Sequence, residues 1–167
     1  MSDIFENRID TVAEDFAVYL KDISNPTVGL TVFDQRSFLQ FFTDRMLIVK
    51  AIRKGIPQSL FKSIKDALPF SEEDWADFLD ISIKSLQRYK KDETHVFKSI
   101  HSEKILELTE VIAMGHEVFD TQEQFSLWLN TPSYALGDMK PIELIKDSYG
   151  KELVINELTR IDQGIFA

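Results

Sequence analysis

The side chains that most often carry out catalysis are few and scattered in this sequence. Its three histidines are His95, His101 and His116. They show no H-x-x-x-H spacing of a zinc site, and the chain contains no cysteine to complete a cysteine–histidine zinc site. The six glycines form no phosphate loop, and no G-x-S-x-G motif is present. The sequence therefore indicates no catalytic residue, no metal site and no cofactor, and we expect a protein that is not an enzyme.

A basic cluster between residues 84 and 91 has the side chains and spacing to contact nucleic acid. Arginine can pair with guanine and glutamine with adenine, while lysine neutralises phosphate. The alternative is a plain helical hairpin whose basic face contacts only water, and spacing alone does not choose between the two. The cluster consists of Lys84, Gln87, Arg88 and Lys91, which share one helix face at i, i+3, i+4 and i+7, with Ser85 beside them.

The chain ends in an apolar tail, Gly164, Ile165, Phe166 and Ala167. Terminal residues are usually polar and frayed unless something holds them. An apolar anchor followed by a carboxylate is suited to a partner's pocket, where a cation or backbone amides can bind the carboxylate. The alternative is that the tail folds back onto its own domain.

The basic cluster lies in the second helix of a predicted helix-turn-helix at residues 71–91. Ser71 and Asp74 form a capping-box pattern that begins the first helix. Ser82 is the expected N-cap of the second helix, which would enter the major groove of DNA. We expect the inner side of that second helix to carry Ile83, Leu86 and one of Tyr89 and Lys90.

The rest of the sequence is also mostly helical in period, so we predict an all-α fold. Only "NPTVGLTVFDQ", residues 25–35, has the β-branched and turn residues of an extended segment. After the helix-turn-helix, we expect helices from about residue 102, from a capping pair at 121 and 124, from Pro141 to a stop at Gly150, and from about residue 151 to a stop at Gly164.

Composition and charge place further limits on the class of protein. The 167 residues are 44% apolar and 28% charged, as in a soluble globular protein with a real core. The sequence shows no signal peptide and no run of about 18 apolar residues, so we expect no membrane association and a cytoplasmic location. The net charge is −4 over residues 1–43, +2 over residues 44–98 and −7 over residues 99–167, so only the middle is suited to DNA.

From about residue 45 onward, the sequence resembles the antitoxins of the Xre/MbcA/ParS-like family. Six segments carry the resemblance in order: "AIRKGIP", "WADFLDISIKSLQRYKK", "SEKILELTEVIAMGHEVF", "WLNTPSYALGDMKPIELI", "YGKELVINEL" and "RIDQGIFA". The resemblance implies an Xre-like helix-turn-helix domain at residues 44–98 and a small helical toxin-binding domain at residues 99–167. Residues 1–43 would form an N-terminal extension whose role the resemblance does not give.

What the resemblance implies about function is an antitoxin of a bacterial type II toxin–antitoxin system. It would neutralise an NAD-consuming toxin of the RES type by inserting its C-terminal tail into the active site. As a homodimer it would also repress its own operon, and with the toxin it would form a larger hetero-oligomer. The resemblance implies that Lys84, Ser85 and Arg88 lie in the recognition helix and that Gly164, Ile165, Phe166 and Ala167 enter the toxin. Together with the helix face described above, we predict that the DNA-binding residues are Lys84, Ser85, Gln87, Arg88 and Lys91. The predicted toxin-binding residues are Arg160, Gly164, Ile165, Phe166 and Ala167.

Two other interpretations stay open at this point. One is a stand-alone helix-turn-helix transcriptional regulator that has no toxin partner. The other is an oligomerisation module that never touches DNA.

Overall fold

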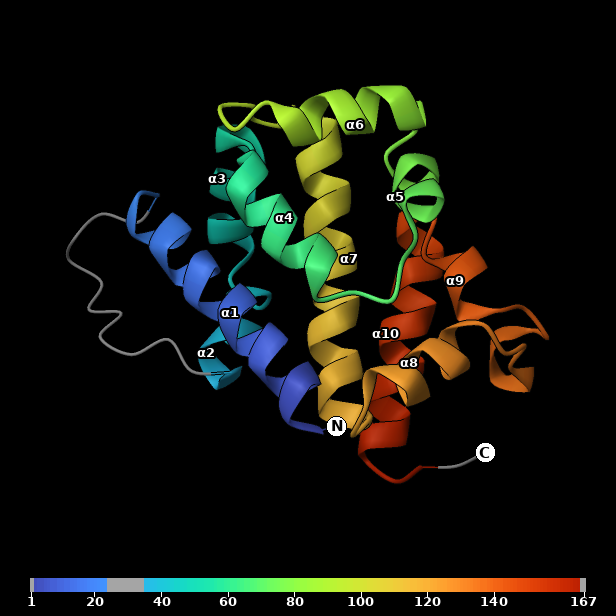
Figure 1. The fold of residues 1–167 in the computed structure, drawn as a ribbon. Coiled ribbons are helices and arrows are strands. Elements are labelled where there is room, and N and C mark those ends of the chain that lie inside the picture. The colour runs from blue at the N-terminus through green and yellow to red at the C-terminus, as the bar shows by residue number, and fades with distance from the viewer. Residues whose placement is uncertain (1, 24–34, 166–167) are drawn as a thin grey trace.

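The computed structural model describes residues 2–23 and 35–165, and within these ranges every regular element is a helix (Figure 1). The all-α prediction is therefore confirmed. The predicted extended segment at residues 25–35 lies almost wholly outside the described residues. None of the described helices is long and apolar enough to cross a membrane.

From α2 onward the elements follow one another with short connections. They are α1 (Ser2–Lys21), α2 (Gln35–Phe41), α3 (Arg45–Lys54), α4 (Gln58–Asp66), α5 (Glu72–Phe78), α6 (Ile83–Lys91), α7 (Ser99–Val118), α8 (Gln122–Leu129), the 3-10 helix η1 (Tyr134–Leu136), α9 (Pro141–Leu144) and α10 (Ser148–Asp162).

The long helix α7 is the centre of the fold, and α1, α2, α3, α8 and α10 all pack against it. Its inner residues Ile105, Leu108 and Val111 are completely buried. At 20 residues α7 is about 30 Å long. It therefore spans the molecule, with α6 across one end and the end of α10 near the other (Figure 1).

Helix α10 runs beside α7 in the same direction, and polar bonds fix its register. Lys104 Nζ donates to the carbonyl of Lys146 at 3.1 Å and also pairs with Glu107 Oε2 at 2.8 Å. One turn later the hydroxyl of Ser148 donates to Glu107 Oε1, and another turn on Lys151 pairs with Glu110 at 2.5 Å. Because these pairs advance together along both helices, the C-terminus of α10 is directed away from α6.

The N-terminal extension belongs to the same core. Phe16 of α1 is fully buried and makes an edge-to-face contact with Phe41, with ring centroids 4.7 Å apart. The hydroxyl of Tyr19 donates to the carbonyls of Ala51 and Gly55, both at 3.0 Å, and burial raises its pKa. Helix α1 thus holds the end of α3 in place while it packs along α4.

Two predicted helix boundaries were wrong. Helix α7 begins at Ser99, three residues before the predicted start, because the amide of Ser102 donates to the carbonyl of the N-cap Lys98 at 2.9 Å and closes the first turn. The buried hydroxyl of Ser102 donates to the carbonyl of Phe97, just before the helix. Gly150 does not end a helix: it lies in the first turn of α10, where its amide donates to the N-cap Asp147 at 2.8 Å. A Cβ at Gly150 would overlap the carbonyl of Leu144, so glycine is required there by close packing.

Candidate functional site

The helix-turn-helix forms as the capping residues predict. Ser71 and Asp74 make a complete capping box, with reciprocal bonds of 3.0 and 2.9 Å. Helix α5 ends where Asp80 adopts a left-handed conformation, at φ 52°, which allows the tight turn. Ser82 then caps α6 by accepting from the amide of Ser85 at 3.0 Å. The completely buried ring of Trp75 fixes α5 on the core.

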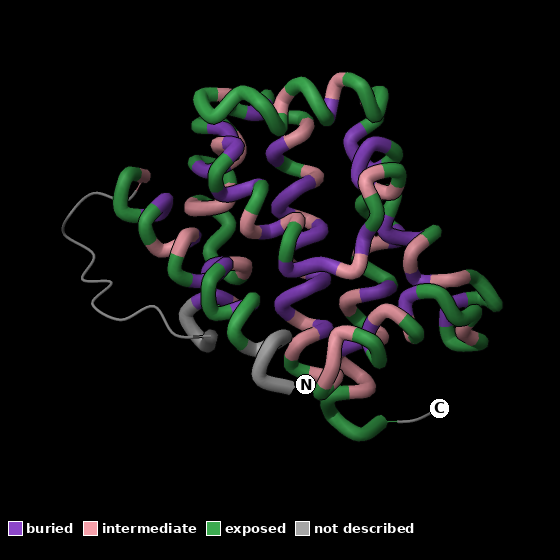
Figure 2. The backbone as a smooth tube through the Cα atoms, viewed as in Figure 1, coloured by how far each residue is buried: buried purple, intermediate pink, exposed green. Residues whose placement is uncertain are grey.

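The basic cluster lies on the outer side of α6. Leu86 is buried and anchors the inner side, and Tyr89 packs partly against the core. Ile83, predicted on the inner side, is instead 39% exposed. Lys84, Gln87, Arg88 and Lys91 are all exposed, while Ser85 is half-buried and bonded to Ser82. Figure 2 shows this end of the molecule as largely exposed surface.

The loop after α6 holds the helix against the rest of the fold. His95 stacks on Tyr89 with ring centroids 3.9 Å apart. The amide of Phe97 donates to the carbonyl of Ile56 at 2.9 Å, and the amide of Gln58 donates to the carbonyl of His95 at the same distance. Burial is the main reason why the pKa of His95 is lowered. These contacts make α6 a rigid surface feature.

Two acidic side chains of α5 form ion pairs within the chain. Glu72 pairs with Lys65 at 2.9 Å and with Lys90 of α6 at 3.3 Å, and these hydrogen bonds lower its pKa. Asp77 pairs with Lys146 at 2.5 Å, and this contact raises the pKa of the lysine. The repulsion that α5 would otherwise exert on phosphate is therefore reduced.

The C-terminal tail begins at a well-defined helix stop. Gly164 has a φ of 69°, and its amide donates to the carbonyl of Ile161 at 3.0 Å. The amide of Ile165 donates to the carbonyl of Arg160 at 2.9 Å, which completes a Schellman motif. Ile165 is 51% exposed, and the Arg160 guanidinium pairs with Glu157 at 3.0 Å. Phe166 and Ala167 lie outside the described residues.

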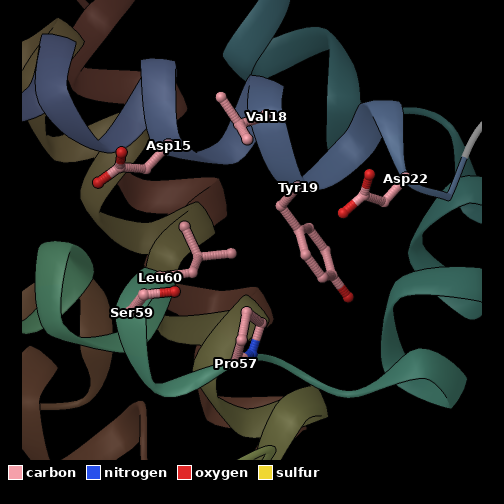
Figure 3. A pocket seen from close by; sticks show the side chains of 7 residues that line it. All are labelled: Asp15, Val18, Tyr19, Asp22, Pro57, Ser59 and Leu60. Carbon is pink, nitrogen blue, oxygen red and sulfur yellow. The ribbon is translucent and has the colours of Figure 1, made fainter. Parts of the chain in front are cut away.

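A separate hollow lies between α1 and the start of α4 and has a volume of about 200 Å³ (Figure 3). The residues that line it are Asp15, Val18 and Tyr19 of α1, Asp22 just after α1, and on the other side Pro57, Ser59 and Leu60. Asp15 accepts a hydrogen bond from Ser63, and Asp22 lies 3.8 Å from Lys54. Because both carboxylates already have partners, we assign the hollow no role. Within the described ranges, no group of acidic and histidine side chains is arranged to hold a metal ion.

Comparison with known proteins matches two adjacent segments to family models. Residues 48–110 match the antitoxin Xre-like helix-turn-helix domain, and residues 114–164 match the antitoxin Xre/MbcA/ParS C-terminal toxin-binding domain. The chain belongs to the Xre/MbcA/ParS antitoxin family. It is therefore an antitoxin of a toxin–antitoxin system, and a toxin is its partner.

The proteins similar to this antitoxin include a curated relative and a chain of a solved complex. The relative, the Prs ADP-ribosylating antitoxin of Sphingobium sp. (strain YBL2), is 27% identical over 128 residues, which is 71% of this chain and 80% of the relative. A chain in the crystal structure of the M. tuberculosis MbcT–MbcA toxin–antitoxin complex has a TM-score of 0.55 and 23% identity. The match covers 66% of this chain and 96% of that chain, and it shows a shared fold.

The N-terminal helices of this antitoxin lie outside both family models. Residues 1–47 precede the first matched segment, yet α1 and α2 contribute eight of the buried apolar side chains of the common core: Ile9, Val12, Ala13, Phe16, Tyr19, Leu20, Phe38 and Phe41. The sequence contains the signal for this packing, since residues 9, 12, 13, 16, 19 and 20 follow a helical period. The family resemblance gave no guidance there.

Proposed function

We propose that this antitoxin neutralises an NAD-consuming toxin of the RES type by inserting its C-terminal tail, Gly164 to Ala167, into the active site of the toxin. We further propose that a homodimer of the antitoxin represses its own operon through α6, alone and in a larger hetero-oligomer with the toxin. The match to a toxin-binding domain favours this function over that of a stand-alone regulator.

The helix stop at Gly164 is the observation that carries the tail proposal. The Schellman motif fixes the direction in which the chain leaves α10, and Ile165 remains half exposed beyond it. Because the start of the tail is already ordered, a partner would lose less conformational entropy on binding it than on binding a flexible peptide. Arg160, whose carbonyl closes the motif, supports the same stop.

The chemistry of the tail suits a pocket for an anionic dinucleotide. A site that binds NAD must attract its diphosphate, and a cation there would also attract the terminal carboxylate of Ala167. The net charge of −7 over residues 99–167 would favour approach to such a pocket. The relative's name associates it with ADP-ribosylation, a reaction in which such a dinucleotide is the donor.

The proposed DNA-binding surface is the exposed side of α6, with Lys84, Gln87, Arg88 and Lys91 as contacts to bases and phosphates and Ser85 beside them. A helix-turn-helix protein reads two half-sites through a two-fold dimer, which is why we propose a homodimer. Since α6 and the end of α10 lie at opposite ends of α7, one chain has room for DNA and toxin together (Figure 1).

Deletion of residues 164–167 tests the proposal. We expect the truncated antitoxin to lose protection against the toxin encoded by the neighbouring gene, and NAD turnover by that toxin to persist in the mixture. The midpoint of thermal unfolding should change little, because these residues pack weakly on the fold. No atom lies within 4 Å of the position that a Cβ of Gly164 would take, and Ile165 is half exposed. Removal of residues 166–167 alone, which keeps the Schellman motif, is the matched variant. If the chain without residues 164–167 folds and still blocks NAD turnover, the tail is not the inhibitor.

A further inference from the structure

The ring of Tyr89 connects the basic face of α6 with the core. The guanidinium carbon of Arg88 lies 5.3 Å from the centroid of this ring, within the distance at which a ring attracts a cation. Neighbouring residues of a helix point about 100° apart, so the side chain of Arg88 must fold sideways to reach the ring. Tyr89 therefore sets the direction in which the Arg88 side chain leaves the helix.

The ring of Tyr89 is itself held by other aromatic side chains. His95 stacks on it, with ring centroids 3.9 Å apart and an angle of 9° between the two planes. Phe97 meets both rings nearly at right angles, at 5.7 Å from Tyr89 and 4.8 Å from His95. Phe97 is fully buried and lies 4.8 Å from Phe61 in the core. A continuous row of rings thus extends from the core to the side chain of Arg88.

A ring holds an arginine without neutralising its charge. Arg160, by comparison, pairs with the carboxylate of Glu157 at 3.0 Å, and this contact uses part of its charge and one of its N–H donors. The π face of Tyr89 attracts the guanidinium of Arg88 but supplies no negative charge. Because Arg88 is also exposed, its charge and its N–H donors stay available to an external acceptor.

Reading a base demands more of an arginine than binding a phosphate does. A bidentate pair with guanine requires the guanidinium fork to lie in the plane of the base, whereas a phosphate contact carries no sequence information. A long side chain loses rotamer freedom when it adopts one geometry, and a side chain that is already held loses less. A ring that fixes Arg88 therefore favours contact with a base.

We propose that Tyr89 is a positioning residue for sequence-specific DNA recognition, which holds Arg88 in the orientation that reads a guanine of the operator. The proposal rests on the proposed function, because it takes α6 as the DNA-reading helix. It adds that Arg88 contacts a base, and that the specificity at this base depends on a neighbouring ring that need not touch DNA.

The experiment is a double-mutant cycle between Tyr89 and Arg88 in the full chain. The two probes are a duplex that carries the promoter of the antitoxin operon and a scrambled duplex of the same length. Tyr89→Leu, which removes the ring and keeps an apolar side chain, should weaken promoter binding about three- to tenfold, the cost of ordering one free side chain. Its binding to the scrambled duplex should change less than about twofold, because that binding depends on phosphates.

The second arm of the cycle uses Arg88→Ala, which should weaken promoter binding at least about fivefold. In this background Tyr89→Leu should have a further effect of less than about twofold, because the side chain that the ring holds is gone. Tyr89→Phe keeps the ring, so it is the matched control and should bind the promoter as the unmodified chain does.

Three results would overturn the positioning role: unmodified promoter binding by Tyr89→Leu, an equal loss on both duplexes, or an equal loss with and without Arg88. The last two would mean that Tyr89 acts only through the fold of α6. Promoter binding by Arg88→Ala at unmodified affinity would instead refute the base-reading role of α6 in the proposed function. The two failures are distinguishable, because they occur in different arms of the cycle.

A measurement on the unmodified chain does not require that any variant folds. The ring current of Tyr89 should move the side-chain NMR resonances of Arg88 upfield of those of Arg53, an exposed arginine of α3. Equal resonance positions for the two arginines would overturn the proposal, even if circular dichroism shows that Tyr89→Leu is unfolded.

Discussion

The two ends of α7 present surfaces of opposite character. At one end α6 exposes cations on a helix whose position is fixed by buried Leu86 and by the stack of Tyr89 on His95. At the other end α10 exposes apolar side chains, and beyond them the tail leaves a helix stop within an acidic region. The first surface suits a polyanion, and the second suits a protein cleft. One core thus positions the two proposed binding surfaces so that they do not compete for space.

The difference also concerns how each surface is held. Helix α6 depends on long-range contacts, since the loop that supports it bonds to residues 56 and 58 across some 40 positions of sequence. The start of the tail depends on local bonds within the last turn of α10. Changes in the core should therefore affect both ends, whereas changes in either surface should affect one.

The largest effect is expected from Trp75→Ala. The indole is completely buried and packs edge-to-face on Phe61 at 5.1 Å and on Phe70 at 5.8 Å. Its loss should reduce the free energy of unfolding by about 3–5 kcal/mol, measured by urea denaturation. Because the two ends share one core, both DNA binding and toxin binding should fall. Loss of DNA binding alone would mean that the ends are independent folding units.

The next largest effect is expected from Lys84→Ala combined with Arg88→Ala. Each lost contact should cost about 1–3 kcal/mol of DNA affinity, so the promoter shift should disappear at moderate salt while toxin binding stays unchanged. Stability should change by less than about 0.5 kcal/mol because both residues are exposed. Lys21→Ala with Arg45→Ala removes the same charge elsewhere and serves as the control. Equal DNA binding by the two double variants would exclude α6 as the DNA-reading helix.

A smaller effect is expected from Gly164→Ala. A Cβ there meets open space, but the left-handed conformation costs a non-glycine residue about 1–2 kcal/mol. The variant should redirect the tail and raise the concentration needed to stop NAD turnover, with DNA binding unchanged. Asparagine tolerates this conformation better than alanine, so Gly164→Asn should keep most of the inhibition of NAD turnover. An inhibition curve that is identical for all three chains would show that the direction of the tail is unimportant.

The smallest effect is expected from mild acid, and it should appear at the α6 end. The pKa values of His95 and His101 are lowered from 6.5, mainly by burial, so the unfolded chain binds protons more readily than the folded chain as the pH falls below 6.5. Stability should therefore decrease from pH 7.5 to 5.5, measured by thermal unfolding. His95→Gln should reduce this dependence. If the stability of His95→Gln depends on pH as strongly as that of the unmodified chain, other titratable groups cause the decrease.

Local sequence signals predicted much of this fold. Ser71 with Asp74, Ser82, and Thr121 with Gln124 all begin helices as expected, because a cap needs only residues three positions apart. Gly164 ends α10 for the same local reason. The family resemblance, now confirmed, came from the order of such short segments. The division at residues 43/44 and 98/99 stays a prediction, as do the proposed DNA-binding and toxin-binding residues.

The sequence by itself determined the helical class, the caps, the basic face of α6 and the helix stop before the tail, because each depends on neighbours within one or two turns. Only the tertiary structure decided the rest. It showed that Gly150 serves close packing against Leu144, that Ile83 is exposed, and that α1 belongs to the core. It also placed α6 and the end of α10 at opposite ends of α7 (Figure 1). These features depend on contacts between residues far apart in the chain, which periodicity within a single helix does not encode.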